Sequence, residues 1–113
     1  MLTVDSLKAF GADTSDGLKR CMDNQAFYLK LVEKALEDKN FEVLEQSIAA
    51  KDLENAFEAA HSLKGVLGNL ALTPIYTPVL EITELLRAKT DTDYSSLLQA
   101  ILDKRAELIA LSK

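Results

Sequence analysis

Residues 53–71 read LENAFEAAHSLKGVLGNLA, and this stretch decides the fold. Successive residues of an α-helix turn by about 100°, so apolar side chains spaced three and four apart gather on one face. That face holds eight residues: Leu53, Ala56, Ala59, Ala60, Leu63, Val66, Leu67 and Leu70. Asp52 stands directly before them as a typical N-cap. The stretch therefore predicts a long amphipathic helix that ends near Ala71 and buries one face in a helical core.

The rest of the chain has the same helical character. Ala, Leu, Glu and Lys dominate, only 4 Gly and 2 Pro interrupt them, and no stretch alternates as a strand does. Before the central helix we expect helices at 3–10, at about 14–21 and at 24–50, the last being one bent helix or two nearly collinear ones. After it we expect a helix from Thr73 or Thr77 to about 89, a turn at 90–93 and a final helix.

Four main helices with short connections pack best as an antiparallel bundle. We therefore expect an all-α fold, an antiparallel four-helix bundle with one or two short extra N-terminal helices. The length of 113 residues suits one domain, and no repeat, linker or low-complexity tract divides it, so we expect a single domain over residues 1–113.

The composition argues against several classes of function. The net charge of −5 is unlike the basic face of a protein that binds nucleic acid or an anionic membrane, and neither partner is expected. One His and one Cys cannot form a structural zinc site, so no metal is expected. No apolar run reaches the ~18–20 residues of a membrane span, and the first residues lack the order of a signal peptide. We expect a cytoplasmic protein.

The single histidine, His61, lies opposite the apolar face of the central helix and should project into water. Its side of the helix also carries Glu54, Phe57, Glu58, Lys64, Gly65 and Gly68. Each glycine in a helix interior costs about 0.5–1 kcal/mol relative to Ala. Two such residues beside the only imidazole indicate that a partner needs access to it. Taken singly, each feature also has an ordinary explanation: an exposed surface His, a Gly at a tight helix contact, a Phe that reaches the core.

An exposed imidazole of this kind suits phosphoryl transfer. A neutral ring nitrogen is a nucleophile that can accept a phosphoryl group and pass it on, given an unobstructed approach and a nearby cation such as Lys64. Ser62 points about 100° away and forms no Ser–His pair. A convex helix surface is unlike the cleft of an acid–base enzyme, and no nucleotide-binding loop is present. These residues indicate a phosphotransfer intermediate rather than a self-contained enzyme.

One run of the central helix resembles a known signature. It reads AHSLKG over residues 60–65 and is followed by Gly68, Asn69, Leu70 and Leu72. This pattern is similar to the A-H-x-L-K-G signature of histidine-containing phosphotransfer (HPt) domains. The segments 11–13, 17–20 and 27–29 also resemble the N-terminal part of that family, so the resemblance covers most of the chain. The family fold, a four-helix bundle with one or two extra N-terminal helices, agrees with the pattern.

The resemblance implies a role for each matching residue. His61 would be phosphorylated through Nε2, Lys64 would help to neutralise the phosphoryl charge, and Gly65 would leave room for an incoming receiver domain. Two positions depart from the family. Its late glycine falls on Ala71, and the Gln that many members carry near the active His falls on Thr83.

We therefore expect a phosphorelay protein. His61 would accept a phosphoryl group from a receiver-domain aspartate or a sensor kinase and pass it to a response-regulator aspartate. The expected partners are a response-regulator receiver domain, a hybrid sensor histidine kinase, or both. Docking would use Phe57, Gly68 and Thr83, and Mg²⁺ would sit on the partner receiver domain, with no cofactor on this chain. We expect a monomer, either free-standing or part of a longer protein. The alternative is a non-catalytic helical adaptor in which His61 has no chemical role.

Overall fold

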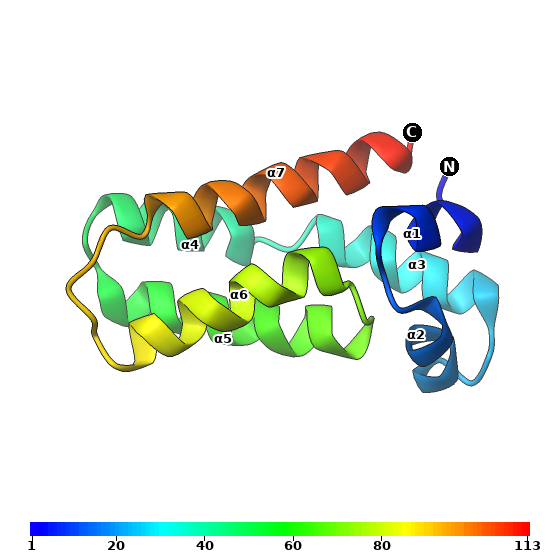
Figure 1. The fold of residues 1–113 in the computed structure, drawn as a ribbon, viewed down its shortest axis with the longest axis horizontal. Helices are drawn as coiled ribbons and strands as arrows, with labels where there is room; N and C mark the ends of the chain where they lie inside the picture. The colour runs from blue at the N-terminus through cyan, green and yellow to red at the C-terminus, as the bar shows by residue number, and fades with distance from the viewer.

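The computed structural model describes residues 1–113 and contains seven helices and no strand (Figure 1). The all-α fold class expected from the sequence is confirmed. In chain order the helices are α1 (Val4–Phe10), α2 (Thr14–Arg20), α3 (Gln25–Leu36), α4 (Asn40–Ala49), α5 (Leu53–Asn69), α6 (Thr73–Arg87) and α7 (Ser95–Leu111).

Helices α4, α5, α6 and α7 form the antiparallel bundle (Figure 1). The central helix α5 packs against α4 on one side and α6 on the other, and α6 packs against α7. Helix α3 continues in line with α4, while α1 and α2 cover one end (Figure 1). This arrangement agrees with the expected bundle and its two short N-terminal helices.

The segment 24–50 consists of two helices, which settles the alternative left open by its sequence. The break falls at 37–39, where Asp38 Oδ1 accepts a 2.8 Å hydrogen bond from the Asn40 backbone N–H. Arg105 of α7 holds both sides of the break. Its Nε and Nη2 donate to the carbonyl oxygen of Leu36 at 2.9 and 2.7 Å, and its guanidinium lies over the Phe41 ring.

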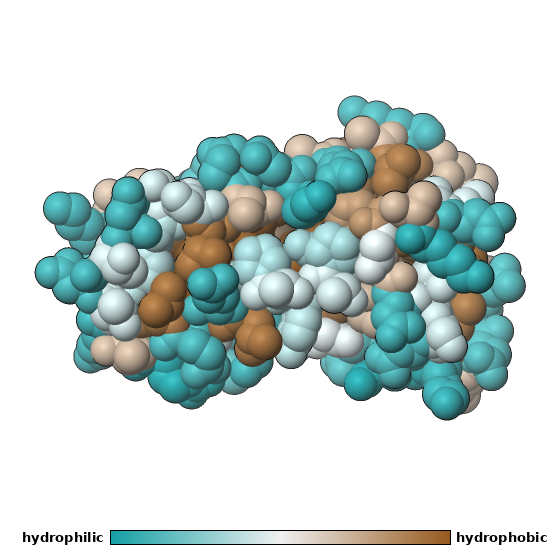
Figure 2. Space-filling model, viewed as in Figure 1, coloured by the Kyte–Doolittle hydropathy of each residue, from teal (hydrophilic) through white to brown (hydrophobic).

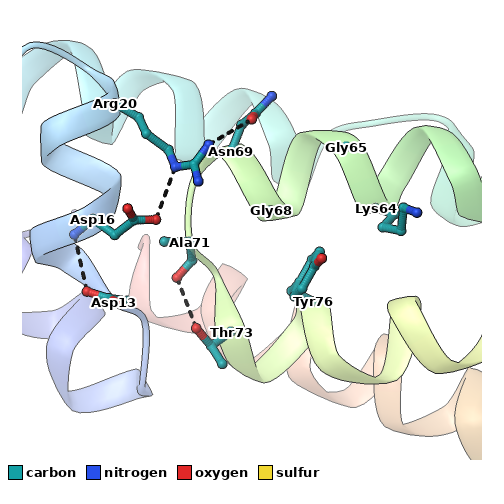
Figure 3. Close-up of a pocket in the computed structure, with 10 residues that line it drawn as sticks. All are labelled: Asp13, Asp16, Arg20, Lys64, Gly65, Gly68, Asn69, Ala71, Thr73 and Tyr76. Carbon is teal, nitrogen blue, oxygen red and sulfur yellow. Dashed lines mark hydrogen bonds and ion pairs between the residues drawn. The ribbon is translucent and has the colours of Figure 1, made fainter.

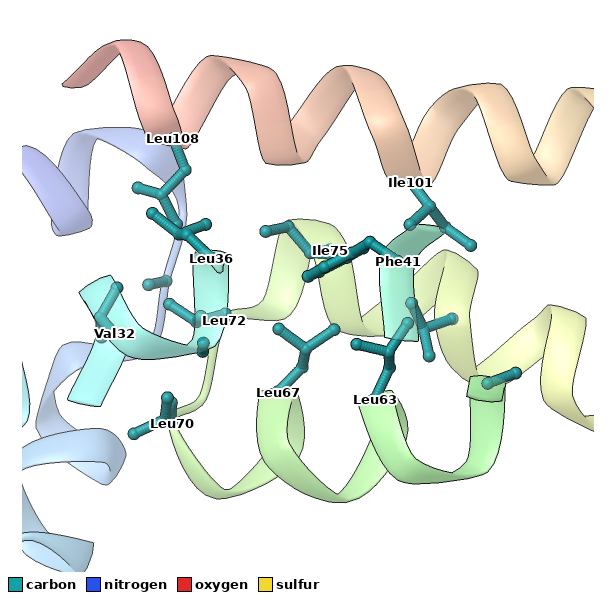
Figure 4. Packing of buried hydrophobic residues seen from close by; sticks show 14 of the residues in the cluster. Val32, Leu36, Phe41, Leu63, Leu67, Leu70, Leu72, Ile75, Ile101 and Leu108 are labelled. Atoms are coloured by element: carbon teal, nitrogen blue, oxygen red, sulfur yellow. The ribbon is translucent and has the colours of Figure 1, made fainter. Parts of the chain in front are cut away.

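The buried core is one cluster of 25 residues, part of which is shown in Figure 4. Its largest fully buried side chains are Leu7, Tyr28, Phe41, Leu44, Leu63, Leu67, Leu72, Ile75, Ile82, Leu86, Ile101 and Leu108. Hydrophilic side chains cover most of the face shown in Figure 2, with apolar residues visible in the gaps between them. None of the seven helices combines the length and apolarity needed to cross a bilayer.

One buried tyrosine fastens the N-terminal helices to the bundle. Tyr28 of α3 has no exposed surface, and its hydroxyl donates a 2.9 Å hydrogen bond to the carbonyl oxygen of Leu70, just after α5. Its ring packs on Gly17 of α2, where a Cβ would lie 2.5 Å from the Tyr28 Oη. The Asp13 backbone N–H also donates to the carbonyl oxygen of Ala71 at 3.0 Å. Helix α2 is thereby fixed beside the end of α5.

Four helices are followed by a left-handed residue that is not glycine. Met22 follows α2 with φ 56°, Lys51 follows α4 with φ 58°, Ala71 follows α5 with φ 55°, and Lys89 follows α6 with φ 52°. After α5, the backbone N–H of Leu72 donates to Leu67 and that of Ala71 donates to Gly68. This is a Schellman motif, whose left-handed position favours glycine. This conformation suits the glycine that the family resemblance implies at position 71 better than it suits Ala71.

The helix after this turn begins at Thr73, the first of the two starts that the sequence allowed. Pro74 then lies in the first turn, where its missing N–H has no partner to lose. Pro78 lies inside the helix, where it removes one backbone hydrogen bond.

Candidate functional site

Helix α5 presents His61 to solvent because the apolar residues on its other side are held in the core. Ala60 and Leu63, which flank the pair His61 and Ser62, are fully buried, while His61 and Ser62 are exposed. The exposure of His61 that the helical pattern predicts is therefore confirmed. Asp52 caps the start of this helix through a hydrogen bond from the Asn55 backbone N–H.

The imidazole of His61 stacks on the ring of Phe57, one turn earlier. Their centroids lie 5.6 Å apart and the ring planes differ by 22°. Phe57 is itself partly buried against the core, and the guanidinium carbon of Arg87 lies 5.0 Å from its ring centroid. The sequence predicted Phe57 as a docking residue. The structure shows that its ring is already engaged by His61 and by a cation from α6.

Two contacts define how α5 and α6 align. Phe57 meets Arg87 near one end, and Gly68 meets Tyr76 near the other. Because the helices are antiparallel, four residues along each from the first contact place Thr83 level with His61. The predicted docking role of Thr83 is wrong. Thr83 has no exposed surface, and its hydroxyl donates a 2.6 Å hydrogen bond to Val79 O of its own helix.

The two glycines of α5 have different surroundings. A Cβ built at Gly65 meets nothing within 4 Å, so the space above it is open. A Cβ at Gly68 would lie 3.0 Å from Cε1 of Tyr76. Gly68 thus allows α6 to approach closely, and the expectation that it clears a docking surface is corrected. Helical side chains lean toward the N-terminus, so a side chain at position 65 would extend over the turn that holds His61.

Lys64 lines a polar groove that begins beside this open space (Figure 3). The groove measures about 450 Å³ and lies between α2, the second half of α5 and the start of α6. Its lining residues are Asp13, Asp16, Arg20, Lys64, Gly65, Gly68, Asn69, Ala71, Thr73 and Tyr76. Lys64 is partly buried and forms no ion pair, so its charge is available to an anion.

The α2 side of the groove is held by its own contacts. Arg20 Nε lies 3.0 Å from Asp16 Oδ2, and its Nη1 donates to Asn69 Oδ1 of α5 at 3.4 Å. On this α2 side of the molecule, burial raises the pKa of Tyr28 to about 12. Cys21, Asp13 and Asp16 raise the same pKa by smaller amounts. Cys21 itself is buried.

Comparison with family models gives a match to the Hpt domain over residues 29–111. The chain belongs to the Hpt domain family. Hpt domains work in phosphorelays with kinases and response regulators, so this Hpt domain has a general role in phosphorelay signalling. The comparison with curated proteins and the comparison with solved structures each found no significant match.

Sequence reasoning missed three residues around the site of this Hpt domain. Arg87, Tyr76 and Arg20 come from α6 and α2, and the apolar pattern of α5 gives no sign of which side chains approach it from those helices. The only available signal for Arg87 was its place near the end of the helix after α5, which an antiparallel hairpin brings back to the start of α5. Residues 1–28, which include Arg20, lie outside the matched range.

Proposed function

We propose that His61 carries the phosphoryl group in this Hpt domain. It accepts the group from an aspartyl phosphate of a receiver domain or from a sensor kinase, and it passes the group to a response-regulator aspartate. The observation that carries this proposal is the exposed ring of the only histidine, with open space over Gly65.

The transfer needs in-line approach of the donor to the ring nitrogen. The Nε2 lone pair of His61 attacks phosphorus, the N–P bond forms, and the P–O bond to the donor aspartate breaks with its electron pair leaving on the carboxylate. Onward transfer reverses these roles: the acceptor carboxylate attacks and the imidazole leaves. Positioning and charge stabilisation supply most of the rate in such transfers.

The side chains around His61 suit both the arrival and the departure of the group. A phosphoryl group adds about −1.5 to −2 charges at neutral pH. Lys64 lies one turn after His61 on α5, and helical side chains lean toward the preceding turn. It is free of ion pairs, so its charge can offset part of the phosphoryl charge. Glu58 is exposed on the preceding turn and opposes it. This mixture favours a group that is held briefly rather than locked in place.

Incubation with a receiver domain that carries radiolabelled aspartyl phosphate tests the proposal. We expect acid-labile, alkali-stable label in the wild-type protein and none in His61→Gln. Ser62→Ala is the matched control, because it removes the neighbouring exposed hydroxyl and should keep the label. Label that survives His61→Gln contradicts the proposal. Absence of label in the wild type, together with unchanged partner binding in His61→Gln, favours the adaptor alternative.

A further inference from the structure

The ring of His61 is oriented by contact with one side chain rather than by hydrogen bonds. None of the side-chain hydrogen bonds in the protein involves His61. On α6, Thr83 lies level with His61, but its hydroxyl is fully buried and donates its hydrogen bond to Val79 O. The remaining restraint is the stack on Phe57, with centroids 5.6 Å apart and planes 22° apart.

This restraint matters because attack requires a defined direction of the nitrogen lone pair. A helical histidine has two common χ1 rotamers, and its χ2 distribution is broad. An aromatic pair biases such a choice by about 2- to 10-fold. The stacked orientation is also the one that helical geometry favours, because side chains lean toward the residue four positions earlier.

Phe57 is itself held in place by α6. Arg87 lies over its ring at 5.0 Å, and Arg87 Nε is 3.4 Å from Glu84 Oε2. The inner part of Phe57 packs against the core. Helix α6, which carries no group that contacts His61 by a hydrogen bond, thus reaches the imidazole through two stacked side chains.

We infer that Phe57 is a positioning residue for phosphoryl transfer and that Arg87 holds it in place. The inference rests on the proposed function of His61. Phe57 touches the imidazole and not the incoming phosphoryl group, and it acts by keeping the ring nitrogen aimed outward. A Phe57 that only anchors a partner would act through docking alone.

Two phosphoryl donors separate these roles. A phosphorylated receiver domain must dock, whereas a small phosphoramidate has no docking surface to satisfy. We expect Phe57→Leu to slow labelling by about 3- to 10-fold with both donors. Phe57→Tyr, which keeps the ring, should restore the rate, and Arg87→Gln should give a smaller loss with both donors. Phe27→Leu is the matched control, because Phe27 is an aromatic residue of α3 that is 44% exposed.

The second readout is the NMR spectrum of the imidazole. His61 is the only histidine, so its ring resonances need no assignment among alternatives. In the wild type the Phe57 ring current should shift them upfield. In Phe57→Leu they should move toward free-histidine values, while Phe57→Tyr and Phe27→Leu should keep them in place.

Each outcome decides the inference. A loss with the receiver donor alone assigns Phe57 to docking and overturns the inference. Unchanged rates or unchanged ring resonances in Phe57→Leu overturn it too. Absence of label in the wild type overturns the proposed function of His61 and the positioning role with it, whereas a labelled wild type with an equally labelled Phe57→Leu overturns the positioning role alone.

Discussion

The hydroxyl of Tyr28 on α3 donates a 2.9 Å hydrogen bond to the carbonyl oxygen of Leu70, the residue directly after α5. The bond is fully buried and spans 42 positions of the chain. It lies at the boundary of the family match, since residue 28 is just outside the matched range. The N-terminal helices are therefore joined to the end of the helix that carries His61 by a specific polar contact as well as by apolar packing.

Loss of this bond should destabilise the protein. Tyr28→Phe leaves the Leu70 carbonyl without its partner in a buried place, and we expect a loss of about 1–2 kcal/mol in the free energy of unfolding. Urea titration followed by circular dichroism measures the change. Tyr76→Phe is the control, because the Tyr76 hydroxyl forms no hydrogen bond in the structure, and its effect should stay within about 0.5 kcal/mol. Equal losses in the two variants would contradict the role of the buried bond.

The same tyrosine should make stability fall in alkaline solution. The pKa of Tyr28 is raised from 10.0 to about 12 by burial, so the unfolded chain loses this proton at a lower pH than the folded protein. The stabilisation is complete below pH 10 and is lost as the pH rises toward 12, by about 1.4 kcal/mol at pH 11. Urea midpoints at pH 8 and pH 11 test this. In Tyr28→Phe the loss of stability between pH 8 and pH 11 should be smaller by the contribution of Tyr28. An identical pH dependence in the variant would show that Tyr28 does not cause the loss.

Substitution of alanine for two of the glycines should change the stability of the protein in opposite directions. Gly65→Ala fills open space in a helix interior and should stabilise the protein by about 0.5–1 kcal/mol. Gly17→Ala places a Cβ 2.5 Å from the Tyr28 Oη and should destabilise it by about 1–3 kcal/mol. Thermal unfolding of both variants measures the pair, with each acting as the other's control. Stabilisation of both variants would show that helix propensity, rather than packing, decides both sites.

A large side chain at position 65 should obstruct partners without harming the fold. Gly65→Leu projects into open space toward His61, so we expect unfolding at or above the wild-type temperature. Phosphotransfer from a receiver domain should fall by about 10-fold or more, because in-line approach is blocked. Gly65→Ala should show a smaller loss. Full transfer to Gly65→Leu would mean that partners reach His61 from another direction.

The end of α5 should gain stability from glycine. Ala71 has φ 55°, a left-handed conformation that costs a residue with a Cβ about 1–2 kcal/mol. The greater freedom of glycine in the unfolded chain offsets part of this gain, so we expect Ala71→Gly to stabilise the protein by about 0.5–1 kcal/mol. Chemical denaturation measures it. Ala106→Gly, in the exposed interior of α7, should instead cost about 1 kcal/mol, and a loss in both variants would rule out strain at Ala71.

The sequence predicted a helix correctly wherever the helix itself carries an apolar repeat and a capping residue. The period of apolar residues predicted α5 and the outward direction of His61, and the predicted N-cap Asp52 is confirmed. The break between α3 and α4 stayed open because it depends on one Asx side chain and on Arg105, 69 positions away from Leu36. The start of α6 stayed open because both Thr-Pro pairs satisfy the same capping rule.

The site was less predictable because its details arise between helices. A wheel of α5 shows which residues share the side of His61, but it says nothing of what lies across from them. Gly65 and Gly68 are equivalent on the wheel, and only the packing of Tyr76 separates them. The burial of Thr83 depends on the rotation of α6 against α5, which the spacing from His61 does not show. Arg87 reaches Phe57 for the same reason.

The packing of Tyr76 on Gly68 gives the protein an intrinsic optical probe at its groove. The chain has no tryptophan and three tyrosines, so its near-ultraviolet emission comes from tyrosine alone. The hydroxyls of Tyr28 and Tyr94 are bonded to backbone carbonyls, while that of Tyr76 is free beside a groove lined by Lys64. A change in tyrosine fluorescence on mixing would then report the arrival of a partner in real time, without a dye and without altering a residue.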